Sequence, residues 1–175
     1  DDLVTGVQTC ALPICSTFTK TWDDRFILKQ ISRVELLTFL ETGPAFFEYM
    51  ANSIFHDLPT LLAKIVGVFR ISYFSTTKNK TVKQDLVVME NVFYNRQVQK
   101  TFDLKGSIRN RYQTSKDAVL LDENLLEFIY DGSPLVTREM SKSLLTMSIY
   151  NDTLFLSKLN VMDYSLLVGV DDNSK

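Results

Sequence analysis

The stretch that most constrains this chain lies near its end, where Asp163 stands between two apolar runs in the sequence NVMDYSLLVGV, residues 160–170. The run Leu166–Val170 is short, apolar and bounded by turn-forming residues, which predicts a buried strand. Asp163 would then lie at the mouth of a packed element, where a carboxylate must be hydrogen-bonded, charge-paired or bound to metal. Two interpretations stay open at this point: a satisfied structural aspartate at the edge of the core, or a functional carboxylate.

The length and composition of the chain exclude several classes of protein. The chain has 175 residues, enough for one domain or two small lobes, and its net charge of −2 gives no field that would attract nucleic acid. No apolar run is long enough to span a membrane. Cys10 and Cys15 offer neither a disulfide framework nor metal-ligand spacing, so an intracellular, reducing setting is expected. The single histidine, His56, cannot anchor a zinc site alone.

Residues 1–15 differ from the rest of the chain. They show no helical or strand periodicity, and they lack the basic and long apolar regions of a signal peptide. Their sequence closely resembles the in-frame translation of a common sequencing adapter. We therefore interpret residues 1–15 as no part of the fold, with a genuine disordered terminus as the alternative.

Residues 24–31, DRFILKQI, form the first strand candidate. Alternation places Lys29 on the same face as Ile27 and Ile31. A lysine on an apolar strand face commonly extends its ammonium outward to water. The alternative is a lysine held in a cleft to meet a phosphate or a carboxylate.

A helix is expected directly after this strand. Ser32 and Glu35 have the spacing of a capping box, which predicts a helix start. The pair Gly43-Pro44 is expected to end this helix, and Pro44 to open a second one. The second helix carries four apolar residues at helical spacing that are expected in the core: Phe46, Phe47, Met50 and Ile54.

Two further strands are expected around a polar, lysine-bearing loop. Residues 65–74 alternate and residues 84–89 are almost wholly apolar, which predicts a hairpin with its loop at 75–81. The second strand runs into Glu90, Asn91 and Phe93. Polar groups beside an aromatic residue at a strand end are compatible with an adenine slot.

The second informative stretch is TFDLKGSIRNR, residues 101–111. Gly106 permits backbone geometry that other residues resist. The N–H groups beside it, together with the side chains of Lys105, Arg109 and Arg111, form a plausible phosphate site. A solvated turn with ordinary surface charge is the alternative.

The rest of the second half is expected to be helical. Residues 122–124, Asp-Glu-Asn, are expected to cap a helix that runs to Ile129, and a longer helix is expected from about Glu139. Its last turn would deliver the chain to Asp163. The pattern predicts an α+β fold in two lobes, a sheet with helices followed by helices with one returning strand, with a hinge near residues 90–94.

Three stretches in this order resemble the phosphatidylinositol phosphate kinase family: DDRFILKQ, FDLKGSIRNR and VMDYSLLVGVDD. The resemblance runs from about residue 16 to residue 172, and with LLDENLLE it is greatest to the PIKfyve-type branch, the phosphatidylinositol 3-phosphate 5-kinases. It implies a two-lobed fold related to protein kinases. An antiparallel sheet with helices would form the N-lobe, followed by a truncated C-lobe.

The resemblance also implies roles for individual residues. Lys29 matches the strand lysine that holds the nucleotide phosphates, and Glu90, Asn91 and Phe93 match the hinge around the adenine. Asp163 matches the catalytic aspartate. The remaining matches lie in the active-site loop, with the two arginines the weaker assignments: Asp103, Lys105, Gly106, Arg109 and Arg111.

The implied activity is an ATP- and Mg²⁺-dependent transfer of phosphate to the 5-position of phosphatidylinositol 3-phosphate, on the cytoplasmic face of endosomal or vacuolar membranes. Regulatory scaffold proteins are expected to bind through regions outside this chain. Phosphatidylinositol 4-phosphate as the substrate, or a phosphoinositide-binding module without catalysis, are the alternatives.

Two departures from the family pattern bear on activity. The glycine-rich loop expected before residue 16 is missing, with Cys15 where a glycine is expected. The family's metal-binding aspartate and activation loop would follow Lys175. We therefore expect this chain alone to be inactive.

Overall fold

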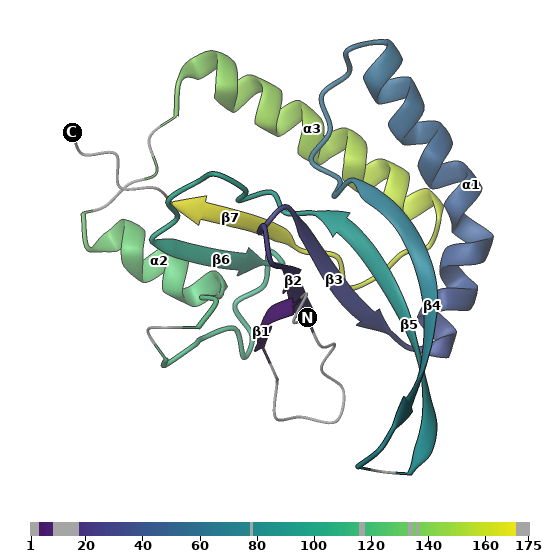
Figure 1. Cartoon of the computed structure of the whole chain (residues 1–175). Coiled ribbons are helices and arrows are strands. Elements are labelled where there is room, and N and C mark those ends of the chain that lie inside the picture. The colour runs from purple at the N-terminus through teal and green to yellow at the C-terminus, as the bar shows by residue number, and fades with distance from the viewer. Residues whose placement is uncertain are drawn as a thin grey trace. The chain divides into compact units, whose positions relative to one another are not determined.

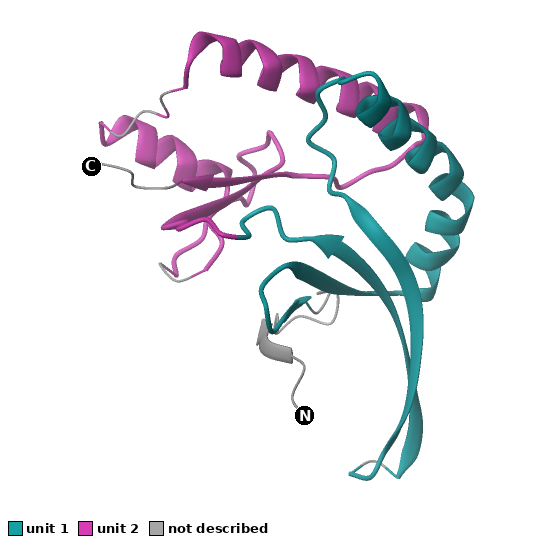
Figure 2. Ribbon diagram, turned by 45° about the horizontal axis from the view of Figure 1, so that its top comes forward, with its two compact units in different colours: residues 1–94 teal, residues 95–175 magenta. Residues whose placement is uncertain are grey.

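The computed structural model describes residues 18–77, 79–115, 118–132, 135 and 137–170, together with the backbone of residues 4–8. The chain divides into two compact units, Asp1–Tyr94 and Asn95–Lys175 (Figure 2). The boundary lies directly after the predicted hinge at residues 90–94. Mixed α and β content with antiparallel sheets is confirmed.

The first unit is built on a five-stranded antiparallel sheet in the order β1-β2-β3-β5-β4 (Figure 1). Its strands are β1 Val4–Gln8, β2 Phe18–Thr21, β3 Phe26–Ile31, β4 Ile65–Ser75 and β5 Lys80–Glu90. The predicted hairpin is confirmed as β4 and β5, although β5 begins four residues earlier than expected. The predicted first strand is β3, which begins at Phe26 because Asp24 and Arg25 belong to the turn after β2.

Strand β1 departs from the expectation that residues 1–15 lie outside the fold. The backbone of Val4–Gln8 pairs with β2, where Val4 lies opposite Thr21 and Gln8 opposite Phe18. Without β1, β2 would be an edge strand with unpaired backbone groups. Such an edge can pair with an extended segment whatever the side chains of that segment are. The missing side-chain periodicity therefore did not prevent pairing. The adapter interpretation itself stays a prediction.

Helix α1, Arg33–Phe55, begins at the predicted capping box. The Ser32 hydroxyl accepts a hydrogen bond from Glu35 N at 3.2 Å, and the Glu35 carboxylate accepts one from Ser32 N at 2.7 Å. The predicted break at Gly43-Pro44 is wrong, because α1 continues through Pro44 as one helix. Aromatic packing spans the proline: the rings of Phe39 and Phe47 meet edge to face at 6.2 Å.

The core of the first unit lies where the sheet meets the start of α1. Ile31 of β3, Leu36 of α1 and Val87 of β5 are buried together, with Ile65, Val68 and Met89 packed around them. The expectation that the aromatic half of α1 lies in the core holds for Met50, which is buried. It is wrong for Phe47 and Ile54, which are 46% and 64% exposed, because this core gathers around the first turn of α1.

The second unit contains a two-stranded antiparallel sheet and two helices. Its elements are β6 Lys100–Leu104, α2 Asp122–Tyr130, α3 Glu139–Lys158 and β7 Leu166–Val170. Both helices and the returning strand are confirmed. Phe102 of β6 is fully buried and packs against Phe128 of α2, with ring centroids 5.9 Å apart.

Two expectations for this unit need correction. The chain has a second strand here, β6, because the polar sequence KTFDL turns one aromatic side chain inward and pairs its backbone with β7. Strand β7 is half-buried rather than buried, with Leu167 43% exposed, because its sheet has only two strands. Among the described residues, no helix is both long and apolar enough to cross a bilayer.

Candidate functional site

In the first unit, the predicted site lysine is paired with a carboxylate from α1. Lys29 lies on β3 between β2 and β5, and its Nζ is 3.1 Å from the Glu35 Oε1 atom. Glu35 Oε2 closes the capping box, so one carboxylate ties the helix start and the lysine together. Partial burial raises the pKa of Glu35, but hydrogen bonds from Ser32 and Lys29 outweigh it and the net pKa is lowered. Lys29 is therefore held in place rather than extended freely into water.

The two roles of Glu35 are separable by mutation. Glu35→Gln keeps an acceptor for Ser32 N but loses the charge that holds Lys29. If Lys29 holds nucleotide phosphates, as the resemblance implies, KM of the full-length protein for ATP should rise by up to roughly fivefold, because an exposed ion pair is worth about 1 kcal/mol at most. Steady-state kinetics measure this, with Glu41→Gln on the same helix as the control. Equal KM values in the two variants would show that the ion pair does not serve nucleotide binding.

The predicted adenine hinge begins at the last residue of β5. The Glu90 side chain pairs with Lys64 at 3.2 Å. Asn91 is buried, and its Nδ2 donates to the Asp24 carbonyl at 2.7 Å while its Oδ1 accepts from Phe93 N at 3.1 Å. Both polar side-chain atoms of Asn91 are thus engaged by backbone groups. This favours a role in shaping the hinge over direct contact with a nucleotide.

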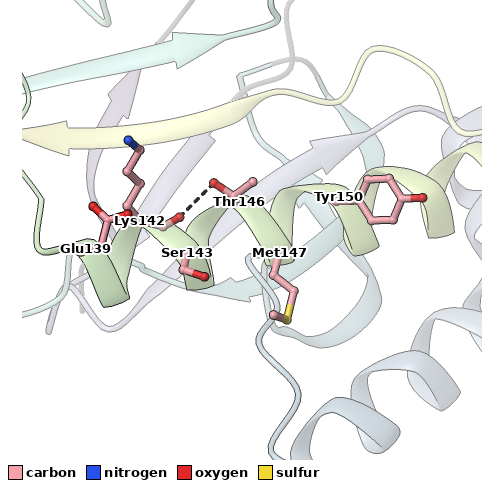
Figure 3. A pocket seen from close by; sticks show the side chains of 6 residues that line it. All are labelled: Glu139, Lys142, Ser143, Thr146, Met147 and Tyr150. Atoms are coloured by element: carbon pink, nitrogen blue, oxygen red, sulfur yellow. Dashed lines mark hydrogen bonds between the residues drawn. The ribbon is translucent and has the colours of Figure 1, made fainter.

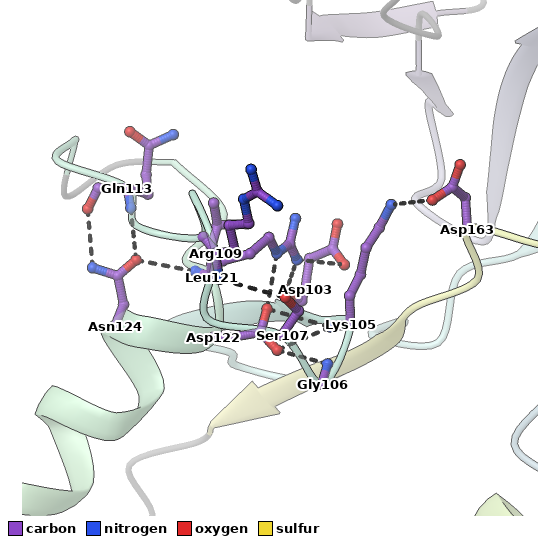
Figure 4. A network of polar contacts seen from close by, with 11 residues as sticks. Asp103, Lys105, Gly106, Ser107, Arg109, Gln113, Leu121, Asp122, Asn124 and Asp163 are labelled. Carbon is purple, nitrogen blue, oxygen red and sulfur yellow. Dashed lines mark hydrogen bonds and ion pairs between the residues drawn. The ribbon is translucent and has the colours of Figure 1, made fainter.

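In the second unit, the structure brings together the two residues that the sequence singled out for chemistry. Lys105 follows β6 and Asp163 precedes β7, two strands whose ends are aligned by the pairing of Leu104 with Leu166. The Lys105 Nζ atom is 3.2 Å from Asp163 Oδ1 (Figure 4). Asp163 has a left-handed backbone with φ 61°, a conformation that aspartate tolerates better than most residues.

Asp163 is charge-paired as expected, but it is not buried. Its side chain is 89% exposed, so the cost of burying a bare carboxylate does not apply here. An ion pair this exposed stabilises the fold by about 1 kcal/mol at most. The position of Asp163 is therefore not explained by folding, which favours the functional interpretation left open above.

The backbone amides of the loop are already engaged by a side chain. Lys105 N and Gly106 N donate to Asp122 Oδ1 at 3.0 and 2.8 Å. Gly106 has φ +73°, the left-handed geometry expected of it. In the structure Asp122 at the start of α2 accepts from these N–H groups, and their binding of phosphate stays a prediction.

The two arginines of the loop have different surroundings. Arg111 donates from Nε to Asp122 Oδ2 at 2.8 Å, and its terminal nitrogen donates to the Asp103 carbonyl and approaches the Asp103 carboxylate at 3.4 Å. Its side chain is 17% exposed. Arg109 is exposed, and within the described residues its guanidinium makes no hydrogen bond or ion pair (Figure 4). The guanidinium of Arg111 is thus engaged within the fold, which favours a structural role, whereas that of Arg109 is available to a ligand.

This difference predicts effects of very different size on stability for two matched substitutions. Arg111→Gln leaves Asp122 buried without its cation, which is expected to lower the free energy of unfolding by about 3 kcal/mol. Arg109→Gln is expected to change it by less than about 0.5 kcal/mol, as for other exposed residues. Urea unfolding of the 175-residue chain measures both. Similar midpoints for the two variants would contradict the assignment.

A hollow of about 500 Å³ lies along α3, and none of the site residues predicted from the sequence lines it (Figure 3). Its lining residues are Glu139, Lys142, Ser143, Thr146, Met147 and Tyr150. All six are exposed side chains of one helix, and the Thr146 hydroxyl donates to the carbonyl of Lys142 within that helix. The hollow is therefore a helix surface rather than an enclosed binding site.

No metal site is assembled within the part of the chain that the structure describes. There, no three carboxylate, thiolate or imidazole groups come together. Mg²⁺ commonly takes only one or two protein carboxylates, with waters and substrate phosphates as its other ligands, so such a cluster is not required to hold it.

Sequence reasoning missed the roles of two carboxylates. Glu35 was identified as a cap, but not as the partner of Lys29, six residues away. Asp122 was expected to cap its own helix, yet its side chain reaches back 17 residues to Lys105. The position of Asp122 at the start of a helix indicated a carboxylate that accepts hydrogen bonds. Nothing local in the sequence showed which donors would reach it.

Comparison with known proteins identifies relatives along nearly the whole chain. Residues 14–175 match the family described as phosphatidylinositol-4-phosphate 5-kinase. The 1-phosphatidylinositol 3-phosphate 5-kinase of Saccharomyces cerevisiae is 53% identical over 161 residues, or 90% of this chain. The protein of the same name from Mus musculus is 50% identical over 165 residues, or 91% of the chain. An Arabidopsis thaliana 1-phosphatidylinositol-3-phosphate 5-kinase is 45% identical over 158 residues, or 89%.

These relatives are far longer than the chain. The matched region covers 7% of the yeast protein, 8% of the mouse protein and 9% of the Arabidopsis protein. The comparisons therefore concern one segment of each relative.

Proposed function

Because the chain belongs to the phosphatidylinositol-4-phosphate 5-kinase family, we propose that it is part of an ATP-dependent lipid kinase that phosphorylates the 5-position of phosphatidylinositol 3-phosphate. The choice of substrate is supported by the names of relatives that are 45–53% identical to the chain. The observation that carries the chemistry is the contact of Lys105 with Asp163 at 3.2 Å.

In this proposal Asp163 orients the inositol hydroxyl and accepts its proton as the hydroxyl attacks the γ-phosphorus of ATP. The bond from that phosphorus to the β–γ bridging oxygen breaks, and ADP leaves. Phosphoryl transfer depends mainly on positioning and on the neutralisation of charge, so an exposed carboxylate beside a cation is suited to the task. Lys105, freed from Asp163 as substrate enters, neutralises charge on the transferring phosphate. Arg109 is available to the phosphate that the lipid headgroup already carries.

Lys29 serves the other substrate. ATP supplies the phosphoryl group, and Lys29 holds its phosphates while Glu35 keeps the ammonium in place. The hinge that follows β5 would lie along the adenine, with Asn91 fixing its backbone and Phe93 offering an apolar face. Glu90 and Phe93 stay proposed nucleotide contacts.

The two units would form the lobes of a kinase-related domain. The family match begins at residue 14, two residues before the domain start predicted at residue 16, and the exclusion of residues 1–15 from the domain stays part of the proposal. Action at endosomal or vacuolar membranes, with scaffold proteins bound elsewhere in the protein, follows from the proposed substrate and is part of the same proposal.

The substrate proposal is tested with the full-length protein that contains this chain. Vesicles carrying either phosphatidylinositol 3-phosphate or phosphatidylinositol 4-phosphate are incubated with labelled ATP, and kcat/KM is measured for each lipid. We expect the 3-phosphate to be preferred. Preference for the 4-phosphate would mean that phosphatidylinositol 4-phosphate is the substrate. Binding of the lipids without transfer of phosphate would favour a non-catalytic phosphoinositide-binding module.

A further inference from the structure

Asp122 is a buried carboxylate that the proposed reaction does not use directly. It is the first residue of α2, and its side chain is only 10% exposed. Aspartate is rarely buried to this degree unless its oxygens are paired. Its partners lie 11 to 17 residues earlier in the chain, in the segment that follows β6.

Three donors converge on this carboxylate (Figure 4). Oδ1 accepts from Lys105 N at 3.0 Å and from Gly106 N at 2.8 Å, while Oδ2 accepts from Arg111 Nε at 2.8 Å. Two successive amides bound to one oxygen fix the peptide planes on both sides of Lys105. The backbone of that residue cannot rotate without breaking at least one of these bonds.

The geometry of this turn determines where the Lys105 side chain can reach. The backbone enters it from β6 and reverses at Gly106, whose φ of +73° few other residues adopt. From this position the Lys105 ammonium contacts Asp163. Among the described residues, Asp122 is the only side chain that accepts a hydrogen bond from the backbone N–H groups of Lys105 and Gly106.

We propose that Asp122 is a positioning residue for phosphoryl transfer, which holds the Lys105–Gly106 turn so that the Lys105 ammonium faces Asp163 and the incoming phosphate. This rests on the proposed function of Lys105. Asp122 does not touch either substrate in this role, and it acts through the backbone of the turn.

The charge state of Asp122 supports this role, because an ionised carboxylate can accept all of these hydrogen bonds. Desolvation by burial raises its pKa, but hydrogen bonds from Arg111, Lys105 N and Gly106 N outweigh this effect, and the pKa is lowered overall. The carboxylate therefore stays ionised, and Arg111 balances its charge. A neutral amide at this position would turn an N–H donor toward one of the three donors.

The test compares Asp122→Asn with Asn124→Ala in the full-length protein. Asn124 is equally buried and holds the same loop at Gln113 and Leu121, but it does not contact the Lys105 turn. Both variants are expected to lose stability, so kinetics are measured below both unfolding midpoints. We expect kcat/KM to fall about a hundredfold for Asp122→Asn, chiefly in kcat, since misplacement by about 1 Å can cost this much. Asn124→Ala should keep kcat/KM near the wild-type value.

The same substitutions in a Lys105→Ala background separate positioning from general damage. If Asp122 acts through Lys105, Asp122→Asn causes little further loss there. An equal loss with and without Lys105, or an equal loss in the Asn124→Ala control, would overturn the proposal.

Hydrogen exchange of the peptide covering residues 103–108 provides a readout that does not depend on activity. Asp122→Asn is expected to speed exchange at Lys105 and Gly106, whereas Asn124→Ala is not. Unchanged exchange in Asp122→Ala, which removes both oxygens, would show that Asp122 does not hold the turn. Faster exchange, combined with a Lys105→Ala variant that keeps full activity, would instead contradict the proposed function of Lys105.

Discussion

Asp163→Asn is expected to lower kcat for lipid phosphorylation by about 10²–10⁴-fold, the range for loss of a general acid–base group. Asparagine matches the shape of aspartate and tolerates the left-handed backbone at φ 61°, so the fold should be retained. The carboxylate contributes little to stability because its side chain is 89% exposed. A fall in kcat therefore reports on the chemical step and not on a loss of stability. Full-length wild-type and variant proteins are compared in the vesicle assay with saturating ATP.

Asp57 offers a matched control for this substitution. It is also an exposed aspartate in the left-handed region, with φ 51°, and it lies in the turn after α1. Asp57→Asn makes the same chemical change at a position without a proposed role. Equal activities for Asp57→Asn and Asp163→Asn would mean that Asp163 is not the catalytic carboxylate.

Lys29→Met is expected to have the second largest effect. Methionine keeps the length of the side chain on β3 but removes the cation proposed to hold the ATP phosphates. Loss of one charged or hydrogen-bonding group that stabilises a transition state costs about 10²–10³-fold in kcat. The measurement is kcat and KM for ATP in the full-length protein, because a residue that served only binding would raise KM alone.

Lys20→Met on the neighbouring strand β2 is the control for Lys29. Lys20 is 51% exposed and pairs with Asp24 at 3.5 Å, so its replacement removes a comparable surface ion pair. Its activity should match wild type. A Lys29→Met protein with wild-type kinetics would contradict the assignment of Lys29 to nucleotide binding.

Much of this fold could be predicted from local pattern. Ser32 and Glu35 marked the start of α1, alternation marked β3 and β4, and Asp122 marked the start of α2. Each of these signals depends on residues close together in the sequence, where spacing alone determines which side chains can meet.

The errors arose where distant parts of the chain decide the outcome. Pro44 has the local signature of a helix break, but the contact of Phe39 with Phe47 spans it. Strand β6 has little apolar pattern of its own and depends on pairing with β7.

The site residues also show this difference between what local sequence indicates and what distant contacts decide. Lys105 and Asp163 were predicted as functional residues, but their contact joins positions 58 residues apart. The loop amides, predicted to bind phosphate, donate in the structure to Asp122 from another element, a contact that the local sequence did not indicate. Arg109 and Arg111 look equivalent in the sequence, and only their surroundings distinguish them.

The most direct test of the central claim is the identity of the lipid product. Full-length protein is incubated with phosphatidylinositol 3-phosphate and labelled ATP, the lipid is deacylated, and the headgroup is separated by ion-exchange chromatography, with Asp163→Asn in parallel. We predict a labelled headgroup that elutes with the 3,5-bisphosphate standard and is nearly absent with the variant. A label at another ring position, or a product that the variant forms at the wild-type rate, would contradict the account.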